Sequence, residues 1–270
     1  MRFVKMQGIG NDFILVDGFR YSPSGNPAAF AAHLCDRHFG IGADGLIWVG
    51  PSEKGDAAMR VFNSDGSEAE MCGNGLRCAV LFLKRMGLVD KLEICVETGA
   101  GLLRCWSVGD SVTVDMGVPR LLPEAIPVDA ASNRVEVLED GCRLNMFCVS
   151  MGNPHAVTFD LFPDRARLYQ LGAKLEKHPM FPRHANIEFC RMSGRDIEAR
   201  VWERGDGPTL ACGTGACACL VAAASMGLSE RECDVLLPGG KLHILWREDD
   251  HVFMTGGAEI VYRGDIDLQH

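Results

Sequence analysis

The chain has 270 residues, 47% of them hydrophobic, and a formal net charge of −9. This length suffices for one large domain or for two domains of roughly 100 to 150 residues with buried cores. No run of Lys or Arg exceeds two residues, which argues against a surface that follows a nucleic-acid backbone. The N-terminal residues contain neither a basic segment followed by an apolar one nor an apolar stretch of membrane length. We therefore expect a soluble cytoplasmic protein with no nucleic-acid or membrane partner.

The chain contains twelve cysteines, but its length and apolar content make a disulfide framework unnecessary. Several cysteines lie in apolar runs, where a reduced thiol behaves as a small hydrophobic side chain. We expect this of Cys35, Cys95, Cys105, Cys142, Cys148, Cys190 and Cys233. The sequence has no C-x-x-C pair and no H-E-x-x-H motif, and Cys212, Cys217 and Cys219 lack a paired histidine motif. We therefore expect no metal site.

Two similar series of strand-like and helix-like segments follow one another along the chain. In the first, the loop M-C-G-N-G-L-R-C at residues 71–78 precedes an apolar segment at residues 79–86. In the second, the loop T-L-A-C-G-T-G-A-C-A-C-L leads into an apolar segment at residues 218–226. Both segments lack a polar face, so we predict two core helices, which Gly87 and Gly227 end at equivalent points. Segments rich in β-branched and aromatic residues predict strands at residues 93–98, 111–115, 199–203, 241–246 and 251–255.

The sequence of the first half recurs in the second half. Fourteen residues between positions 60 and 117 recur 140 positions later, including Cys72 as Cys212, whereas composition alone predicts roughly four matches. One repeat of this length indicates duplicated domains rather than a solenoid. We therefore predict an α+β fold with two pseudosymmetric domains, residues 1–117 and 118–270. Each is expected to be a β-sheet wrapped around a central apolar helix, with the active site in the cleft between the domains.

Each repeated loop places a cysteine directly before a helix N-terminus. Free backbone N–H groups and the positive end of the helix dipole favour an anion there, so we expect a lowered thiol pKa. Two sulfurs on opposite faces of one carbon can remove a proton from one face and return a proton to the other, which inverts the stereocentre. The glycines let the backbone approach a substrate carboxylate, and no pyridoxal lysine or metal is required.

Two simpler interpretations of the same cysteines stay open at this point. Cys72 and Cys212 can be packing residues at glycine turns that were copied by duplication, because short glycine-rich motifs are weak evidence. The two cysteines can also form a disulfide or a redox pair.

Together, the motifs of the chain resemble those of the diaminopimelate epimerase family, which interconverts the LL and meso forms of 2,6-diaminopimelate without a cofactor. The resemblance covers almost the whole chain. It is carried by F-V-K-M-Q-G-I-G-N-D-F at 3–13, F-N-S-D-G-S-E-A-E-M-C-G-N-G-L-R-C at 62–78, G-N-P-H-A-V at 152–157, H-A-N-I-E-F at 184–189, V-W-E-R-G at 201–205, A-C-G-T-G-A-C-A at 211–218 and L-P-G-G-K-L at 237–242. It implies a cytoplasmic, pyridoxal-phosphate-independent isomerase, often a homodimer, in the pathway to lysine and peptidoglycan precursors.

The resemblance also implies a role for each matching residue. Cys72 and Cys212 match the two acid/base cysteines, and His155 and Glu203 match the groups that tune them. The turns that hold the substrate α-carboxylate match Gly73, Asn74, Gly213 and Thr214, and the other substrate-binding positions match Asn11, Asn63, Asn153, Asn186, Glu203 and Arg204. A cluster of Asn with one Arg suits a substrate that carries an ammonium and a carboxylate at each end.

Three of these residues have a structural alternative that the sequence leaves open. Asn63 precedes Ser-Asp-Gly and can simply form a turn. His155 can be a hydrogen-bonded buried imidazole, and Arg204 can pair with Glu203 or Asp206 at the surface.

The sequence departs from the family pattern at two positions. Gly45 stands where many members have a substrate-contacting Gln, and Gly257 stands where Pro is usual. Proline racemases, hydroxyproline epimerases, histidine racemase and the phenazine-pathway isomerases use the same fold and cysteine logic, so another amino-acid racemase is the alternative function. A non-catalytic thiol or metal-binding protein is a more distant one.

Overall fold

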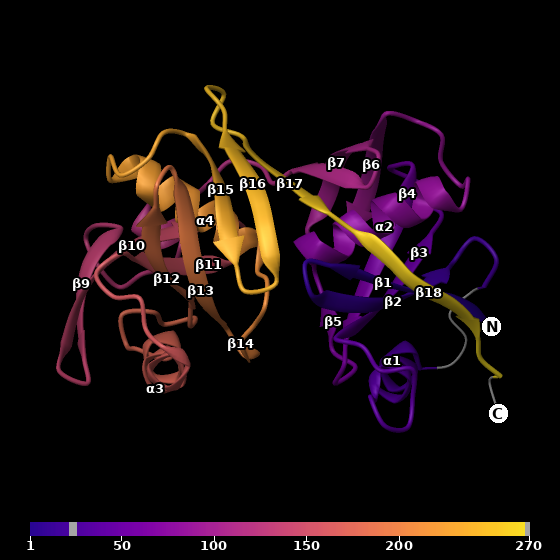
Figure 1. Cartoon of the computed structure of the whole chain (residues 1–270), viewed down its shortest axis with the longest axis horizontal. Coiled ribbons are helices and arrows are strands. Elements are labelled where there is room, and N and C mark those ends of the chain that lie inside the picture. Colours follow the sequence, from indigo (N-terminus) through magenta and orange to yellow (C-terminus); the bar gives the residue numbers. More distant parts are fainter. Residues whose placement is uncertain (22–25, 268–270) are drawn as a thin grey trace. The chain divides into compact units, whose positions relative to one another are not determined.

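The computed structural model describes residues 1–21 and 26–267 of the chain (Figure 1). The chain folds into two compact units. Unit 1 contains Met1–Val114 together with the segment that starts at Thr255, and unit 2 is Asp115–Met254. Helices and strands occur in both units, so the predicted α+β class is confirmed.

Unit 1 is a mixed sheet with two helices. Its strands are β1 (Arg2–Gly8), β2 (Asn11–Asp17), β3 (Gly45–Gly50), β4 (Ala57–Asn63), β5 (Glu68–Ala69), β6 (Glu93–Thr98), β7 (Gly101–Val108), β8 (Ser111–Asp115) and β18 (Glu259–Asp265), and its helices are α1 (Pro27–Cys35) and α2 (Gly73–Arg85). The strand order is β18, β1, β2, β3, β4, β6, β7 and β8. Only the pairs β2 with β3 and β4 with β6 are parallel in this series.

Unit 2 repeats this order of strands and helices. Its strands are β9 (Arg134–Glu139), β10 (Cys142–Ser150), β11 (Pro154–Thr158), β12 (Asn186–Ser193), β13 (Asp196–Glu203), β14 (Gly207–Pro208), β15 (Glu232–Leu237), β16 (Gly240–Trp246) and β17 (Val252–Gly257), with helices α3 (Arg165–Glu176) and α4 (Gly213–Ser225) and the 3-10 turn η1 (Pro123–Ala125). The order β9, β10, β11, β12, β13, β15, β16 again has two parallel pairs, β11 with β12 and β13 with β15.

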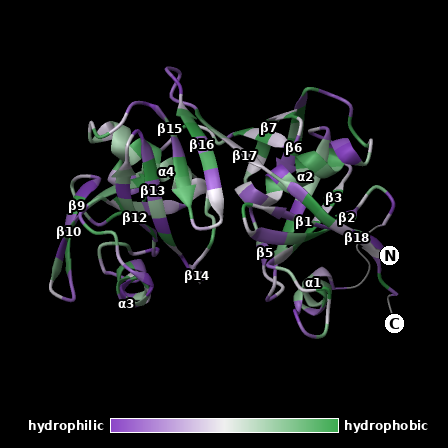
Figure 2. Cartoon of the chain, in the orientation of Figure 1, coloured by the Kyte–Doolittle hydropathy of each residue, from purple (hydrophilic) through white to green (hydrophobic). Residues whose placement is uncertain are grey.

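Each unit is built around one buried helix. Helix α2 packs against β1, β2, β3, β4 and β7, and α4 packs against β10, β11, β12, β13, β15 and β16. All residues from the start of α2 through Leu83, and from the start of α4 through Ala223, are buried. Strands β6 and β15 share one alternating burial pattern, and hydrophobic and hydrophilic segments alternate along the strands in Figure 2. The predicted arrangement of a sheet around a central apolar helix is therefore present in each unit.

The helix boundaries follow local chemistry at both ends. The C-caps Met86 and Met226 are followed by Gly87 and Gly227 with φ of 66° and 73°, as predicted. Both helices begin directly after the cysteines, at Gly73 and Gly213, as predicted, so they also include the glycine-rich residues that precede the apolar runs. Of the predicted strands, 93–98 and 111–115 coincide with β6 and β8, while 199–203, 241–246 and 251–255 overlap β13, β16 and β17.

The repeat changes register by one residue after the helices. Trp106 lies opposite Glu93 in the hairpin of β6 and β7, whereas Leu245 lies opposite Glu232 in the hairpin of β15 and β16. The structural counterpart of Trp106 is thus Leu245, although Trp246 carries the matching letter. Trp246 matches Trp106 in the sequence at an offset of 140 positions, but the two residues do not occupy equivalent places in the strand pairing.

The predicted second domain, residues 118–270, is wrong at its C-terminal end. Strand β18 pairs antiparallel with β1, with Arg2 opposite Asp265, so the segment from Thr255 belongs to unit 1. In unit 2 the corresponding edge is filled by β9, which directly precedes β10. In unit 1 the equivalent place, beside β1, is taken by β18. Among the described residues, no helix is long and apolar enough to span a bilayer.

Candidate active site

In unit 1 the strand pairing brings three positions that the sequence analysis singled out to one edge of the sheet. Asn11 begins β2 and Gly45 begins β3, and these two strands run parallel. Asn63 ends β4 and lies directly opposite Gly45, because β4 is antiparallel to β3. A Cβ at Gly45 would lie 2.8 Å from the backbone oxygen of Phe62, so a larger residue there requires a shift of the backbone.

The strand pairing of unit 2 collects the equivalent positions in the same way. Asn153 immediately precedes β11, Asn186 begins β12, and Glu203 ends β13. His155 on β11 lies opposite Asn186 in the parallel pair. The start of the central helix carries the cysteine in each unit, so we name these two groups of residues the Cys72 half-site and the Cys212 half-site.

In the Cys72 half-site, the cysteine is the N-cap of α2. Its half-buried side chain accepts a hydrogen bond from the backbone N–H of Gly75 at 3.4 Å. The thiol also lies 3.8 Å from Oδ1 of Asn11, and the Asn74 amide donates to the same oxygen at 3.2 Å. The structure therefore brings together three residues that the sequence assigned to the site.

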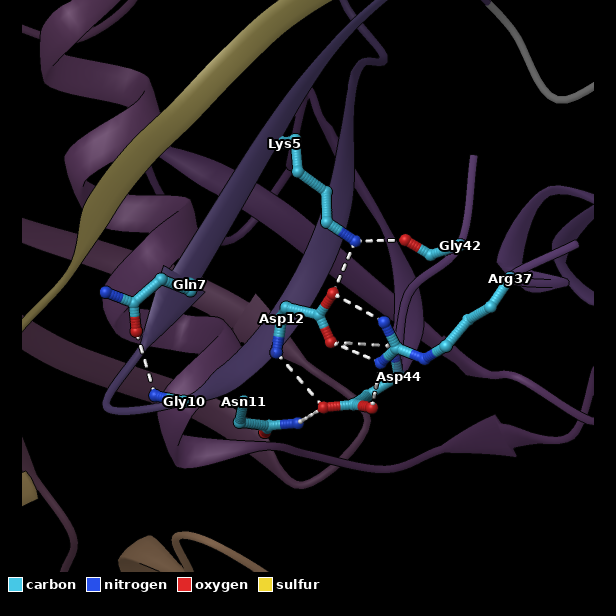
Figure 3. A network of polar contacts seen from close by, with 8 residues as sticks. All are labelled: Lys5, Gln7, Gly10, Asn11, Asp12, Arg37, Gly42 and Asp44. Carbon is cyan, nitrogen blue, oxygen red and sulfur yellow. Dashed lines mark hydrogen bonds and ion pairs between the residues drawn. The ribbon is translucent and has the colours of Figure 1, made fainter. Parts of the chain in front are cut away.

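A network of charged side chains holds Asn11 in place (Figure 3). The Asn11 amide nitrogen donates to Oδ2 of Asp44 at 2.7 Å, and Arg37 donates to Oδ1 of Asp44 at 2.7 Å. Arg37 also binds Asp12, whose other partner is the buried ammonium group of Lys5 at 2.5 Å. Burial raises the Asp12 pKa, but hydrogen bonds from Arg37 and Lys5 outweigh it and lower this pKa to about 2. The sequence analysis did not identify these four charged residues.

The side chain of Asn63 supports a turn. Its amide donates to Oγ of Ser67 at 3.0 Å, and its backbone N–H donates to the Ser67 carbonyl at 2.8 Å. Asp65 accepts from the backbone N–H of Ser67, which closes the same turn. Asn63 thus forms the turn that the sequence left open as its alternative role. The turn places this residue at the sheet edge beside Gly45.

In the Cys212 half-site, the sulfur is buried and is surrounded by donors. Cys212 is only 4% exposed and is the N-cap of α4. Its Sγ accepts from the backbone N–H of Gly215 at 3.3 Å and lies 3.5 Å from the Thr214 hydroxyl. The Asn153 amide donates to that hydroxyl at 3.3 Å.

The acid-base state of Cys212 differs from the expectation based on its helix position. Burial, followed by the charge of the nearby Glu203, raises the Cys212 pKa well above its ordinary value. Burial also raises the Glu203 pKa, and hydrogen bonds with Thr209 and Cys212 oppose that rise. The expectation of a lowered thiol pKa is therefore wrong for Cys212, because the desolvation of the thiolate outweighs the hydrogen bonds at the helix start.

His155 is fully buried and is bonded at both ring nitrogens. Nδ1 lies 2.6 Å from Oε1 of Glu188, and Nε2 lies 3.0 Å from Oδ1 of Asn153. Burial raises the Glu188 pKa, and His155 opposes that rise. His155 thus reaches the Cys212 sulfur through Asn153 and Thr214 rather than directly. The sequence analysis missed Glu188, although a glutamate within the apolar segment N-I-E-F was a visible signal.

Asn186 and Arg204 are joined through the backbone. The Asn186 amide donates to the Pro154 carbonyl at 2.9 Å, and its oxygen accepts the backbone N–H of Arg204 at 2.9 Å. The exposed Arg204 guanidinium donates to the Arg183 carbonyl at 3.1 Å. Glu176, which the sequence analysis also missed, holds this loop by accepting from Trp202 and from the backbone of Gly205.

The remaining cysteines serve packing. Cys35, Cys105, Cys148, Cys190 and Cys233 are buried and reduced as predicted, and Cys95 and Cys142 are reduced but only half-buried. Within residues 1–21 and 26–267, no group of three or more His, Cys, Asp or Glu side chains has the arrangement of a metal site.

Solved structures with this fold define the class of protein. A Bacillus anthracis phenazine biosynthesis protein of the PhzF family superposes with a TM-score of 0.70 at 16% identity and covers 99% of each chain. A probable proline racemase from Agrobacterium radiobacter K84 superposes with a TM-score of 0.69 at 16% identity and covers 99% of this chain and 93% of that chain. The chain thus has the same fold as these proteins.

The sequence relatives define the family within this class. The model of the diaminopimelate epimerase family matches residues 3–122 and 147–261. The diaminopimelate epimerase of Acetivibrio thermocellus is 50% identical over 99% of both chains. The chloroplastic enzyme of Oryza sativa subsp. japonica is 48% identical over 98% of this chain and 79% of its own length. The chain belongs to the diaminopimelate epimerase family and is an isomerase that needs no pyridoxal phosphate, which confirms the resemblance read from its motifs.

Proposed function

We propose that Cys72 and Cys212 are the two acid/base groups with which the chain epimerises LL-2,6-diaminopimelate to the meso form. Membership of the family supports the reaction. The observation that carries the assignment is the matched position of the two sulfurs. Each is the N-cap of a buried helix and accepts the backbone N–H of a glycine three residues later.

The proposed reaction is a proton exchange between two sulfurs and one carbon. One cysteine, as thiolate, takes the α-proton, so that an S–H bond forms as the C–H bond breaks and the electron pair stays on the carbon. The other cysteine, as thiol, gives its proton to the opposite face. This scheme requires both sulfurs to reach opposite faces of the same carbon.

The helix starts supply binding groups for the reacting carboxylate. Backbone N–H groups at Gly73, Asn74, Gly213 and Thr214 lie at the positive ends of α2 and α4, where an anion is favoured. The same groups stabilise the negative charge that develops when the α-proton leaves. We assign the remaining contacts with the substrate to Asn11, Asn63, Asn153, Asn186, Glu203 and Arg204, which lie at the strand ends beside the two helices.

The proposal is tested by incubating reduced protein with LL-diaminopimelate in deuterated water. We expect meso product that carries one solvent deuterium at the inverted carbon. Cys72→Ser and Cys212→Ser should each abolish inversion, because each sulfur is needed once as acid and once as base. A single variant with near-normal inversion rules out the two-base scheme. If the wild-type protein with both thiols free gives no product, proline, histidine and lysine are assayed in the same way.

We further propose a cytoplasmic homodimer, on the basis of the family resemblance. Light scattering on the purified protein is expected to give twice the chain mass of 29.4 kDa at micromolar concentration. A monomer mass in an active preparation contradicts the dimer without affecting the cysteine assignment. Cell fractionation with an antibody to the chain tests the location.

A further inference from the structure

A continuous chain of hydrogen bonds joins a buried carboxyl group to the sulfur of Cys212. It starts at Glu188 on β12 and runs through His155 on β11, Asn153 and Thr214. The successive distances are 2.6, 3.0, 3.3 and 3.5 Å. Glu188 and His155 have no exposed surface, and all five residues belong to unit 2.

The partners fix the direction of these hydrogen bonds. The Asn153 amide presents its nitrogen to the Thr214 hydroxyl and its oxygen to Nε2 of His155. Nε2 must therefore carry a proton, and Thr214, whose oxygen accepts from Asn153, has its own proton available for the Cys212 sulfur. Each donor from His155 onward thus points toward Cys212.

This direction sets the number of protons on the pair of Glu188 and His155. Since Nε2 carries one proton, the contact of 2.6 Å between Nδ1 and Glu188 needs a second proton to be a hydrogen bond. That proton lies either on the carboxyl or on the ring, and the pair has no net charge in both cases. A pair without net charge fits complete burial, because an unpaired buried charge is strongly unfavourable.

Other ionisable groups face the same region from the neighbouring elements. They are Glu203 from β13, Cys148 from β10, Cys190 from β12, and Cys212 and Cys219 from α4. Glu203 is on the other side of the chain of hydrogen bonds, at the Cys212 sulfur itself. The cysteines at 148, 190 and 219 are buried free thiols, and Glu188 supplies the carboxyl group at the inner end of the chain of hydrogen bonds.

We propose that Glu188 is a positioning residue for Cys212, which acts by holding the proton that directs this chain of donors toward the sulfur. In the opposite arrangement, Glu188 would be a carboxylate and the His155 ring would carry its only proton on Nδ1. The Asn153 amide would then have to turn over, and Thr214 would accept from the Cys212 thiol instead of donating to it. The two directions have opposite effects. Donors aimed at the sulfur stabilise the thiolate, whereas an acceptor aimed at it stabilises the thiol. The inference rests on the proposed role of Cys212.

The contact with Gly215 explains how Glu188 is kept in position. A Cβ at residue 215 would lie 2.9 Å from Oε1 of Glu188 and 3.2 Å from the Cys212 sulfur. The carboxyl group is thus packed directly beneath the first turn of α4, and only glycine leaves it this space.

The test measures the Cys212 pKa in the free full-length protein. Iodoacetamide alkylation of Cys212 is followed by peptide mass spectrometry over a range of pH, in the wild type and in Glu188→Gln, Glu188→Ala and Thr214→Val. We expect Glu188→Gln to keep the wild-type value, because its amide can donate to Nδ1. We expect Glu188→Ala and Thr214→Val to raise the Cys212 pKa by about one unit, which is a tenfold smaller thiolate fraction.

A lower Cys212 pKa in Thr214→Val overturns the proposal, because it means that Thr214 accepted from the thiol. A lower value in Glu188→Ala overturns it as well, because it shows that Glu188 acted as a negative charge. Thr214→Val leaves the buried pair intact and decides the question if Glu188→Ala does not fold. Inversion activity in Cys212→Ser, in contrast, contradicts the role of Cys212 itself, and this outcome is independent of the alkylation result.

Discussion

At the scale of single residues, the amide of Asn11 has one permitted orientation. Its nitrogen faces the Asp44 carboxylate, and its oxygen faces the Asn74 amide nitrogen and the Cys72 thiol. A turned amide would place oxygen against the carboxylate and nitrogen against a second nitrogen. Asp44 therefore determines that Cys72 meets a carbonyl oxygen.

Replacing Asp44 by Asn removes this constraint on the Asn11 amide. The new side chain at position 44 can either accept from the Asn11 nitrogen or donate to the Asn11 oxygen, so both orientations of Asn11 become possible. We expect Asp44→Asn to lower kcat/KM by about tenfold, the equivalent of one charge-assisted hydrogen bond. The melting temperature should change little, since the Asp44 side chain is 43% exposed. Asp110→Asn is the matched control, because Asp110 is also an exposed partner of an arginine in unit 1. Wild-type kcat/KM in Asp44→Asn would contradict the positioning role.

The ion pair of Lys5 and Asp12 predicts a pH-dependent contribution to stability. The Lys5 side chain is 7% exposed, and Asp12 is the carboxylate that pairs with its buried ammonium group. The Asp12 pKa of about 2 lies below the unfolded value of about 4, so the stabilisation is complete above pH 4 and is lost as the pH falls through about 2. We expect Asp12→Asn to lower the free energy of unfolding by about 3 kcal/mol at pH 7, because it leaves a buried charge unpaired.

Urea unfolding of Asp12→Asn and wild type at several pH values measures this difference. It should narrow as the pH is lowered from 4 toward 2. Glu136→Gln, which removes an exposed pair with Arg143, serves as control and should change the free energy by less than about 1 kcal/mol. A difference that stays constant below pH 4 would show that Asp12 acts by packing and not by charge.

At the scale of elements, the two cysteine-capped helices tolerate substitution differently. A Cβ at Gly75 would meet the end of the flexible Ile47 side chain at 2.7 Å, while a Cβ at Gly215 would meet Glu188 and Cys212. We expect Gly215→Ala to lower kcat at least about tenfold more than Gly75→Ala, since only the former displaces a proposed catalytic sulfur and a buried carboxyl. Circular dichroism and kcat of both variants measure this. Equal losses of kcat would contradict the difference between the half-sites.

The sequence predicted those elements whose causes are local. Helix ends at Gly87 and Gly227 and the helix starts beside Cys72 and Cys212 follow from glycine and capping chemistry within a few residues. The two core helices were predicted from the apolar runs in their sequences. The family motifs, rather than spacing, supplied the side chains at the strand ends.

The remaining features depend on contacts between distant positions. Glu188 meets His155 across 33 positions, and Asp12 meets Arg37 across 25. Such pairs are formed by tertiary packing of segments that are distant in the sequence, which the order of residues alone does not specify. The pKa of Cys212 was predicted in the wrong direction for the same reason, because a helix start is visible in the sequence and the burial of its sulfur is not.

At the scale of the whole molecule, strand β18 and Ile266 lie beside the first residues of the chain. The Met1 amino group donates to the Ile266 carbonyl at 2.6 Å, and Arg2 lies opposite Asp265 in the pair of β1 and β18. Read from β9, the chain therefore contains the strands of unit 2 followed by β18 and then the rest of unit 1. A circular permutant that joins the ends and opens the chain before β9 would make each unit nearly continuous in sequence.

We expect such a permutant to fold and to retain epimerase activity within about threefold of the wild type, because chain ends at exposed loops are tolerated.

The ends are joined by a short Gly-Ser linker, and the chain is opened between Leu121 and Leu122, which are both exposed. The control uses the same linker but opens the chain between Val80 and Leu81, inside the buried helix α2, and should not fold. Far-UV circular dichroism, urea unfolding and the deuterium assay are applied to both chains. If the first permutant is as unfolded as the control, the chain needs its covalent connection between Leu121 and Leu122 to fold, and the prediction is wrong. If the permutant folds and is active, that connection is dispensable and a linker between the ends leaves the pairing of β18 with β1 intact, which is the outcome that the antiparallel register from Arg2 to Gln7 predicts.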